Sequence, residues 1–360
     1  MKKSLKSCIA FLALLTALLS GASAKSNPTV KTEVASIDKH GNVNLAVSGT
    51  LFSAQGFGLG DLVSVKVGSV KFDAPTGKNY TDVDHGAYIL RINGEEVSLA
   101  INLGNFADKT GATVGTPVTV TMKERLGYLR TYQARLLSKS SNRSDFDSDE
   151  TFANFRAVKG GALAENRLFR SCNPVESDER APFAAALAEK AGVAVVLNLS
   201  DTEEEASGRI ADFPYYQKLS NTGSVKYVAM GASFTDKNFA SHLHDGLSYL
   251  AKRQGPYYIH GKEGRTRTGM LCSLLAALCG ASMEELKEDY MQSYVNYYHV
   301  RPDTVQYASL AQAVPDFFKA LNGGRDVSDK NLQAVAEKYL LKTVKLSAEE
   351  IEAIRKGLCK

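Results

Sequence analysis

One loop of the 360-residue sequence combines the residue types that bind phosphate. A strand-like run, Tyr257-Tyr258-Ile259, leads into this loop, and an apolar helix follows it from Met270 to Leu278. Consecutive backbone N–H groups in such a loop can surround an anion, and the positive end of the helix strengthens the attraction. The sequence therefore predicts a phosphate-binding loop made by Gly261, Lys262, Glu263, Gly264, Arg265, Thr266 and Arg267.

Two residues of the loop have distinct expected roles. The Arg267 guanidinium could contact two phosphate oxygens at once, because its donors form a planar fork. Gly264 would permit the tight curvature of the backbone. Lys262 and Arg265 could raise the local positive potential, and exposed solubilising charge is an equally good interpretation of both.

The loop resembles the signature of the cysteine-dependent protein tyrosine phosphatases, His-Cys-x-x-Gly-x-x-Arg-Thr/Ser-Gly. Five positions match, and Gly261 stands where that family has cysteine; the matching residues are His260, Gly264, Arg267, Thr268 and Gly269. Three flanking segments resemble the bacterial secreted members of the family: Asn154-Phe-Arg156, Leu168-Phe-Arg-Ser171 and residues 289–298. The resemblance runs from about Asp149 to the C-terminus. A loop that only caps a helix would not need this flanking context.

The resemblance also implies a mechanism that this chain lacks a residue to perform. In the family, the cysteine thiolate attacks phosphorus, the arginine stabilises the transition state, and an aspartate protonates the leaving oxygen. Gly261 has no side chain, so no covalent intermediate can form. The resemblance thus predicts a phosphatase-like domain that is inactive as written, with His260 and Thr268 supporting the loop.

The general acid is not identified by the sequence. Thr266 occupies the place where many bacterial relatives have an aspartate proposed as the acid, and threonine cannot serve as one. Asp236 and Asp212 lie in loop-like stretches that could approach the site, although a surface turn or helix cap is the favoured interpretation of each. Cys172 is the one cysteine in a loop near a motif, but nothing places it on the floor of the site. His260 is expected to hydrogen-bond the loop backbone.

The elements around the loop predict an α/β domain with a largely parallel sheet. Residues 184–191 read as a helix, 193–199 as a buried strand, and 239–254 as a helix before the strand at 257–259. Beyond Thr268 the pattern is almost wholly helical. We assign residues 151–325 to this domain, and residues 326–360 to two short closing helices.

The N-terminal part predicts an export signal and a small β-rich domain. Residues 1–24 have early lysines, an apolar stretch and small residues before the expected cleavage site, as a signal peptide does. The apolar stretch is shorter than the ~20 residues that span a bilayer. Residues 25–137 contain short alternating strands, and residues 37–43 and 99–105 resemble the C-terminal domain of SAM hydroxide adenosyltransferases. A binding or packing module is the interpretation, and residues 138–150 form a polar linker or surface strap.

Composition limits the partners and cofactors. Removal of the signal lowers the formal charge from +4 to +1, which argues against nucleic acid. No CxxC motif or His/Cys cluster indicates a metal, and no cofactor is expected. The cysteine spacing gives no disulfide framework, and Cys272 and Cys279 are interpreted as small buried apolar residues.

Three functions are consistent with these observations. The first is a secreted pseudophosphatase that binds a phosphorylated protein or small phosphorylated ligand. The second is an active secreted phosphatase whose cysteine has been replaced by Gly261 through engineering. The third is an extracellular scaffold that binds through the N-terminal β domain. The sequence does not predict the oligomeric state.

Overall fold

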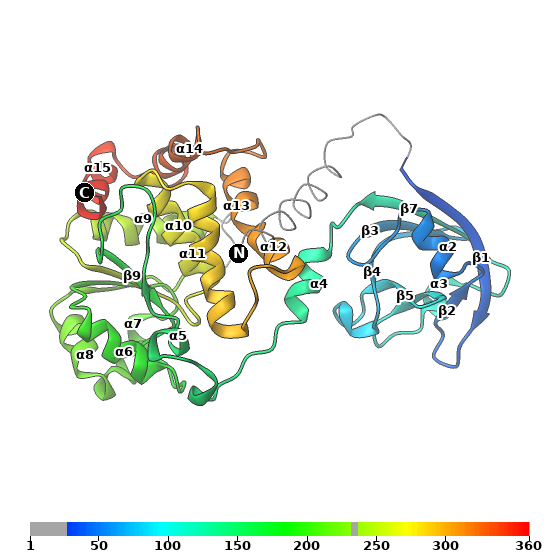
Figure 1. The fold of residues 1–360 in the computed structure, drawn as a ribbon, viewed down its shortest axis with the longest axis horizontal. Coiled ribbons are helices and arrows are strands. Elements are labelled where there is room, and N and C mark those ends of the chain that lie inside the picture. The colour runs from blue at the N-terminus through cyan, green and yellow to red at the C-terminus, as the bar shows by residue number, and fades with distance from the viewer. Residues whose placement is uncertain (1–26, 232–236, 360) are drawn as a thin grey trace, which may run out of the picture. The chain divides into compact units, whose positions relative to one another are not determined.

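The computed structural model describes residues 27–231 and 237–359, and the chain divides into two compact units, Met1–Arg135 and Leu136–Lys360 (Figure 1). The expected signal peptide lies outside the described residues, and so does Asp236. None of the described helices combines the length and the apolar composition needed to cross a bilayer.

The first unit is a closed seven-stranded barrel with the strand order β1-β2-β6-β5-β4-β3-β7. Its strands are β1 (Thr29–Ile37), β2 (Val43–Leu45), β3 (Leu62–Val67), β4 (Val70–Gly77), β5 (Tyr88–Asn93), β6 (Glu96–Ile101) and β7 (Pro117–Glu124). Alternate residues such as Val63, Val65 and Val67 are buried, because successive side chains of a strand face opposite sides. The predicted β-rich fold is confirmed, and closure of the sheet leaves no unpaired edge.

Short helices accompany the barrel. They are α2 (Gly49–Ala54), α3 (Phe106–Thr110), α4 (Leu129–Arg135) and the 3₁₀ turn η1 (Tyr80–Asp82). Phe52 of α2 and Phe106 of α3 are fully buried in the barrel core, which anchors both helices.

The second unit is built on a five-stranded sheet with the order β11-β10-β12-β9-β8. The strands are β8 (Arg156–Ala157), β9 (Leu168–Ser171), β10 (Val195–Asn198), β11 (Val225–Tyr227) and β12 (Tyr257–His260). All pairings are parallel except that of the edge strand β8 with β9. The predicted α/β class with a parallel-rich sheet is therefore confirmed.

Helices cover both faces of this sheet. They are α5 (Asp149–Phe152), α6 (Ala181–Lys190), α7 (Glu203–Ser207), α8 (Pro214–Asn221), α9 (Lys237–Ala251), α10 (Thr266–Leu278), α11 (Met283–Tyr298), α12 (Val305–Ala311), α13 (Ala313–Leu321), α14 (Leu332–Tyr339) and α15 (Ala348–Leu358). Tyr257 and Ile259 of β12 face a large core with α10, whereas Tyr258 faces a smaller core with α6 and α8. Burial on both faces explains why the strand reads as a continuous apolar run.

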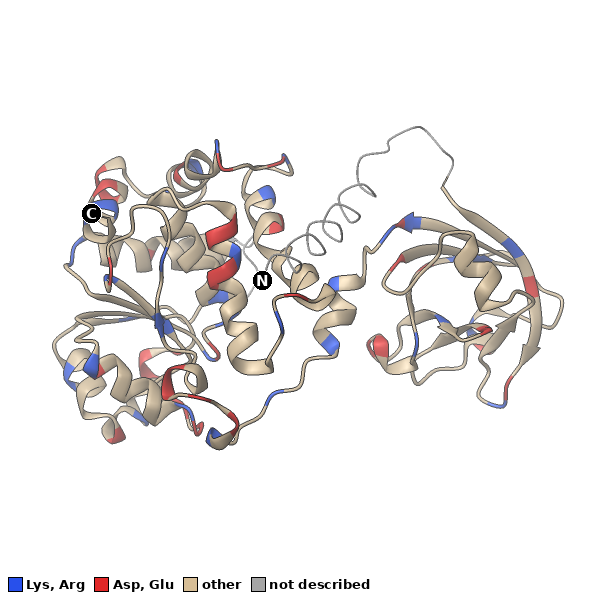
Figure 2. Cartoon of the chain, viewed as in Figure 1, with Lys and Arg blue, Asp and Glu red and all other residues tan. Residues whose placement is uncertain are grey.

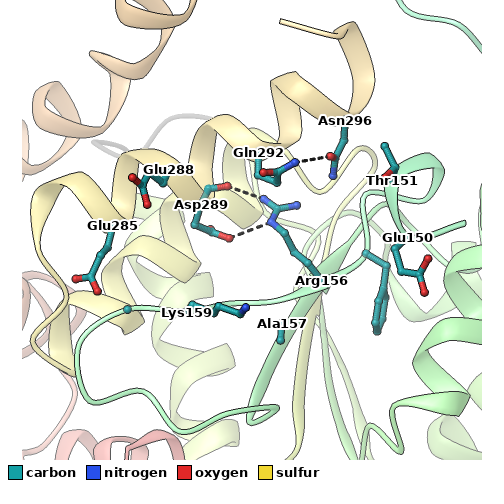
Figure 3. A pocket seen from close by; sticks show the side chains of 12 residues that line it. Glu150, Thr151, Arg156, Ala157, Lys159, Glu285, Glu288, Asp289, Gln292 and Asn296 are labelled. Atoms are coloured by element: carbon teal, nitrogen blue, oxygen red, sulfur yellow. Dashed lines mark hydrogen bonds and ion pairs between the residues drawn. The ribbon is translucent and has the colours of Figure 1, made fainter. Parts of the chain in front are cut away.

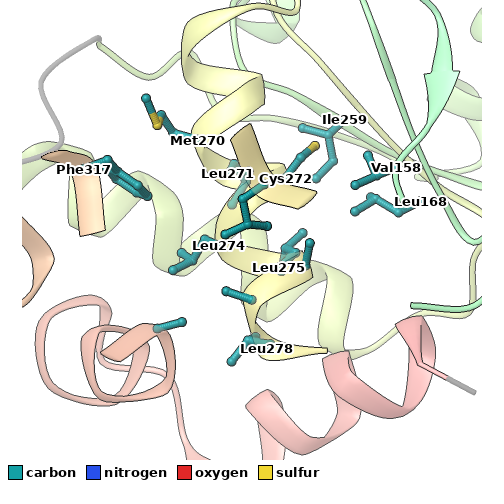
Figure 4. Packing of buried hydrophobic residues seen from close by; sticks show 14 of the residues in the cluster. Val158, Leu168, Ile259, Met270, Leu271, Cys272, Leu274, Leu275, Leu278 and Phe317 are labelled. Atoms are coloured by element: carbon teal, nitrogen blue, oxygen red, sulfur yellow. The ribbon is translucent and has the colours of Figure 1, made fainter. Parts of the chain in front are cut away.

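Helix α10 is the centre of the larger core. Every residue from Thr268 to Leu278 is buried, and Figure 4 shows its side chains among Ile259, Leu168 and Phe317. The closing helices α14 and α15 join the same core. Acidic residues lie along the first turns of α11, as Figure 2 shows. Their negative charges interact favourably with the positive end of the helix dipole.

A disulfide joins the end of α10 to the end of the chain. Cys279 and Cys359 are bonded, with Cα atoms 6.0 Å apart, although 80 residues separate them in sequence. This corrects the prediction that Cys279 is a free apolar residue, since packing of α15 brings its partner to it. Cys272 is free and buried, as predicted.

The polar segment 138–150 packs along the second unit. Phe146 is buried against Phe152, and the Ser140 carbonyl accepts a hydrogen bond from Arg180. Lys139 Nζ lies 3.1 Å from the Glu263 carboxylate in the predicted phosphate loop. The segment is a strap on this unit, and it contacts the loop directly.

Candidate phosphate-binding loop

The loop lies at the carboxyl edge of the parallel sheet. Residues 261–265 join the central strand β12 to α10. The neighbouring strands β10 and β9 run parallel to β12, so the residues that follow them reach the same edge. Ligands of open α/β sheets bind at this edge.

The backbone carbonyls of the loop all have donors. Each carbonyl of residues 261–265 accepts a hydrogen bond, and four of the five donors lie outside the loop segment itself. The donors are Gly264 N to Gly261 O (3.1 Å), Asn173 N to Lys262 O (3.3 Å), Asn154 Nδ2 to Glu263 O (3.1 Å), Arg170 Nη2 to Gly264 O (2.7 Å) and Gly269 N to Arg265 O (3.0 Å). This set of bonds fixes the orientation of the peptide planes.

The amides of the same loop have no such partners. Within the described part of the chain, the N–H groups of Lys262, Glu263, Arg265, Thr266 and Arg267 have no hydrogen-bond acceptor. These donors therefore remain available to an external acceptor. A concave set of amides at a helix N-terminus is an anion-binding arrangement.

Glycine is required at position 264. Its φ is +64°, a conformation that side chains rarely adopt, and a Cβ there would lie 1.8 Å from the Ser171 carbonyl oxygen. Gly264 thus permits both the left-handed backbone conformation and the close approach of the loop to the strand β9.

Arg267 is half-buried and held by one nitrogen. Its Nη1 donates to the carbonyls of Leu199 (3.0 Å) and Met230 (2.5 Å), while Nε and Nη2 have no acceptor among the described residues. Burial lowers the pKa of this guanidinium, and the nearby Asp201 carboxylate opposes the change. The two unoccupied nitrogens form the edge that can contact two oxygens of an anion.

Position 261 could hold a side chain. Gly261 does not have a positive φ, and a Cβ there would lie 3.1 Å from Thr268 Oγ1 and 3.8 Å from Leu199 Cβ, with no other close neighbour. The backbone therefore does not require glycine. With glycine present, the loop has no atom that could attack phosphorus.

A buried network supports the loop from behind. Arg170 is fully buried, and it binds the Asp289 carboxylate as well as the loop carbonyls. Asp289 also pairs with Arg156 at 3.0 Å, as Figure 3 shows beside a cavity of about 490 Å³. Burial alone would raise the pKa of Asp289, but the two guanidiniums lower it below its ordinary value. The flanking motifs of the sequence thus position the loop.

Asn154 belongs to the same support. Its side chain donates to Glu263 O and to Ser293 Oγ, and it accepts from Arg156 and Asn296. The bond to Glu263 O fixes that loop carbonyl, and the other three contacts hold the Asn154 side chain in place.

His260 and Arg265 have other partners than expected. His260 is fully buried, and its Nε2 lies 2.9 Å from the Tyr216 hydroxyl rather than bonding to the loop backbone. Burial lowers the pKa of His260 to about 3, so the ring is neutral. Arg265 packs its guanidinium over the rings of Tyr294 and Tyr298 and pairs with Glu263. Its side chain therefore braces the loop, while Lys262 is exposed.

Asp201 is a site residue that the sequence analysis missed. It follows β10 and accepts hydrogen bonds from Asn173, Asn198 and Arg209. Burial acts to raise its pKa, but these bonds lower it overall, so Asp201 is ionised and is not a proton donor. Its position just after a buried strand, at the sheet edge that holds the loop, is the signal that could have identified it.

The structure also describes three other residues that were weighed as catalytic groups, Asp212, Thr266 and Cys172. Asp212 is exposed at the end of a 3₁₀ turn (Ile210–Asp212), and Thr266 lies at the start of α10. Burial raises the pKa of the Cys172 thiol to about 12, so it is not a nucleophile. In the described part of the chain, no three His, Cys, Asp or Glu side chains are arranged to hold a metal.

Two family models match the chain. The model described as "Tyrosine phosphatase family" matches residues 150–360, more than half of the sequence. The model described as "SAM hydroxide adenosyltransferase C-terminal domain" matches residues 32–119. No curated protein matches.

Several solved structures are similar to parts of the chain. An uncharacterized conserved protein from Thermotoga maritima has 28% identity and a TM-score of 0.25, over 27% of this chain and 37% of that one. A conserved hypothetical protein from Thermus thermophilus has 21% identity and a TM-score of 0.19, over 25% of this chain and 34% of that one. The match therefore spans only about a third of each of these proteins. The core catalytic domain of the PP-IP phosphatase SIW14 from S. cerevisiae has 18% identity and a TM-score of 0.31, over 52% of this chain and 92% of that one.

Proposed function

The chain belongs to the tyrosine phosphatase family, and we propose that its loop of residues 261–267 binds the phosphate group of a phosphorylated protein or small molecule without hydrolysing it. The observation that carries this proposal is the asymmetry of the loop. Its carbonyls are bound by donors, whereas five of its amides have no acceptor among the described residues.

Charge also supports phosphate as the ligand. The guanidinium of Arg267 presents Nε and Nη2 beside these amides, and α10 adds its N-terminal dipole. Charge-assisted hydrogen bonds from arginine and amides to phosphate are stronger than bonds between neutral groups. A phosphate bound here would also compensate the half-buried positive charge of Arg267.

Two features support the lack of hydrolysis. Gly261 supplies no nucleophile, and the buried thiols of Cys172 and Cys272 have pKa values raised to about 12 by burial. Two described carboxylates, Asp201 beside Arg267 and Glu263 in the loop, are held in ion pairs with Arg209, Lys139 and Arg265.

Calorimetric titration tests the proposal. Inorganic phosphate and phosphotyrosine are titrated into the protein, and then into Arg267→Met and Lys262→Ala variants. Arg267→Met should lose at least about tenfold in affinity, because it removes a charged fork. Lys262→Ala, which alters an exposed side chain, should change affinity at most slightly. No heat from a folded sample, or hydrolysis of p-nitrophenyl phosphate by the Gly261 protein, would contradict the proposal.

A gain-of-function variant distinguishes natural loss from engineering. The backbone at position 261 favours the second candidate function, because the Cβ of a cysteine would require only a small shift of the Thr268 hydroxyl, 3.1 Å away. If the Gly261→Cys protein hydrolyses p-nitrophenyl phosphate, the nucleophile is the only catalytic group that the site lacks. Phosphate binding without turnover would mean that further catalytic groups are also missing, as the threonine at position 266 suggests.

Export is part of the proposal. The signal-like residues 1–24 favour it, and the disulfide between Cys279 and Cys359 supports it, because disulfides persist in oxidising compartments. Expression with the natural N-terminus in a bacterium, followed by mass spectrometry of the periplasmic protein, should find a chain that begins at Lys25 with the disulfide formed. An uncleaved, reduced protein in the cytosol would contradict export.

A further inference from the structure

The hydroxyl of Thr268 is a buried polar group without a partner. Thr268 is 1% exposed, and its Oγ1 makes no hydrogen bond to any described residue. The carbonyl one turn earlier, Gly264 O, is bound by Arg170 at 2.7 Å. Threonine in a helix commonly bonds that carbonyl, but the Thr268 hydroxyl does not. A buried hydroxyl without a partner is destabilising unless a ligand or water satisfies it.

This hydroxyl faces the floor of the loop. A Cβ at Gly261 would lie 3.1 Å from Thr268 Oγ1, and the one other neighbour within 4 Å is the apolar Leu199 Cβ. Apart from the adjacent residues of the loop, the described neighbours of the space over Gly261 are therefore one hydroxyl and one aliphatic carbon. A group that enters it can find a hydrogen-bond donor in Thr268.

We propose that Thr268 binds the ligand directly, and that one terminal oxygen of the phosphate group enters the space over Gly261 to accept a hydrogen bond from Thr268 Oγ1. This inference rests on the proposed phosphate binding and extends it. The other oxygens then face the loop amides and the Nε–Nη2 edge of Arg267. Gly261 is on this view part of the binding site, because any side chain there would occupy the space that the oxygen uses.

The chemistry of the pair favours this contact. A hydroxyl donating to a phosphate oxygen forms a charge-assisted hydrogen bond, which is short and strong. The contact also satisfies the Thr268 hydroxyl, which lacks a partner among residues 27–231 and 237–359. The ligand class is a phosphate monoester or inorganic phosphate, since either provides a terminal oxygen that can point toward the floor.

The test compares Thr268→Val with Thr268→Ser by calorimetric titration with inorganic phosphate. Valine has nearly the shape of threonine but no hydroxyl, so Thr268→Val should bind phosphate at least about tenfold more weakly. Thr268→Ser keeps the hydroxyl and should stay within about threefold of the parent protein. Equal phosphate affinity of Thr268→Val and the parent would overturn the inference while leaving the proposed function intact. Absence of binding by the parent itself would overturn both.

A thermal readout separates a binding role from a structural one. Without ligand, Thr268→Val should melt at the same or a higher temperature than the parent, because it removes a buried unpaired hydroxyl. With saturating phosphate, the order should reverse. A Thr268→Val protein that melts lower in both conditions would show that the hydroxyl serves the fold, and would overturn the inference.

A double-mutant comparison tests the position of the oxygen. Gly261→Ala places a methyl group over the floor, so Thr268→Val added to it should change phosphate affinity by less than about threefold. If Thr268→Val still weakened phosphate binding by about tenfold in the Gly261→Ala background, the hydroxyl would not need the space over Gly261 to contact phosphate. That result would overturn the proposed contact.

Discussion

The two sides of the phosphate-binding loop differ in how completely they are bonded. On the outer side, five carbonyls have donors, and Arg170, Asn154 and Asp289 form a buried network behind them. On the inner side, five amides, two nitrogens of Arg267 and the Thr268 hydroxyl have no partner in the described structure. The fold therefore maintains the binding surface without a nucleophile, because a nucleophile at position 261 would contribute only to the inner side.

The largest predicted effect comes from removing the charge behind the outer side. Asp289→Asn leaves the buried guanidiniums of Arg170 and Arg156 without their carboxylate. Breaking a buried ion pair in this way should lower the free energy of unfolding by about 3–5 kcal/mol. Urea denaturation followed by helix circular dichroism measures it, and Asp303→Asn, at an exposed pair with Arg301, is the control. A variant as stable as the parent would show that the network does not stabilise the loop.

A smaller loss is expected where the outer side meets β9. Gly264→Ala combines a positive φ of +64° with a Cβ that would lie 1.8 Å from Ser171 O. Strain and overpacking together should cost about 2–4 kcal/mol. Gly192→Ala is a matched control, since its φ is +63° and no atom lies within 4 Å of the added Cβ.

The Gly192 control isolates the contact from the backbone strain. Gly192→Ala should cost only about 1–2 kcal/mol, which is the strain of the left-handed conformation. Gly264→Ala should in addition abolish phosphate binding, whereas Gly192→Ala should preserve it. If both variants lost the same stability and retained binding, the close approach at Ser171 would not shape the loop.

The next effect depends on pH and on His260. Burial lowers the pKa of His260 from 6.5 to about 3, so below pH 6.5 the unfolded chain binds a proton that the folded chain does not. Stability contributed by the neutral ring is therefore full above pH 6.5 and decreases as the pH falls toward 3. Between about pH 7 and pH 5 the free energy of unfolding should decrease by about 2 kcal/mol through this group. Urea titrations of the parent and of His260→Gln at both pH values measure the free energies of unfolding. An equal change in the free energy of unfolding of the two proteins between these pH values would contradict the prediction.

The sequence predicts the loop and the fold class because both are local or periodic. The apolar runs at 195–198 and 257–260 identify buried parallel strands, and glycine and arginine in the loop indicate an anion site. The roles of Arg170 and Asn154, by contrast, depend on contacts between residues far apart in the sequence. They contact the loop across 94 and 109 residues of sequence, and spacing carries no information about such contacts.

The same limit explains the corrections. Cys279 and Cys359 meet because α15 packs against α9 and brings the end of the chain to the end of α10, and His260 contacts Tyr216 because α8 packs in the core on the other face of the sheet. Asp201 is absent from the sequence prediction because its neighbours Asn173 and Arg209 come from separate loops. A motif identifies residue types, whereas the partner of each polar group depends on the tertiary fold.

The last prediction concerns the inner side and the thiol that it would activate. In Gly261→Cys, the new thiol would lie beneath the loop amides and close to Thr268 and the N-terminus of α10. These donors favour the thiolate, so its pKa should be below about 7.5. Cys172 provides the contrast within the same protein, because burial raises the pKa of its thiol to about 12.

The pH dependence of iodoacetamide alkylation, followed by mass spectrometry of the peptide that carries the introduced thiol, measures that pKa. Adding Thr268→Val should raise it by removing one donor, while Cys172 should remain unmodified in every variant. A new thiol with an ordinary pKa near about 8.5 would mean that the amides do not converge on the floor. The contrast between a fully bonded outer side and a receptive inner side would then be wrong, because an inner side that does not stabilise a thiolate would not be expected to stabilise a phosphate oxygen.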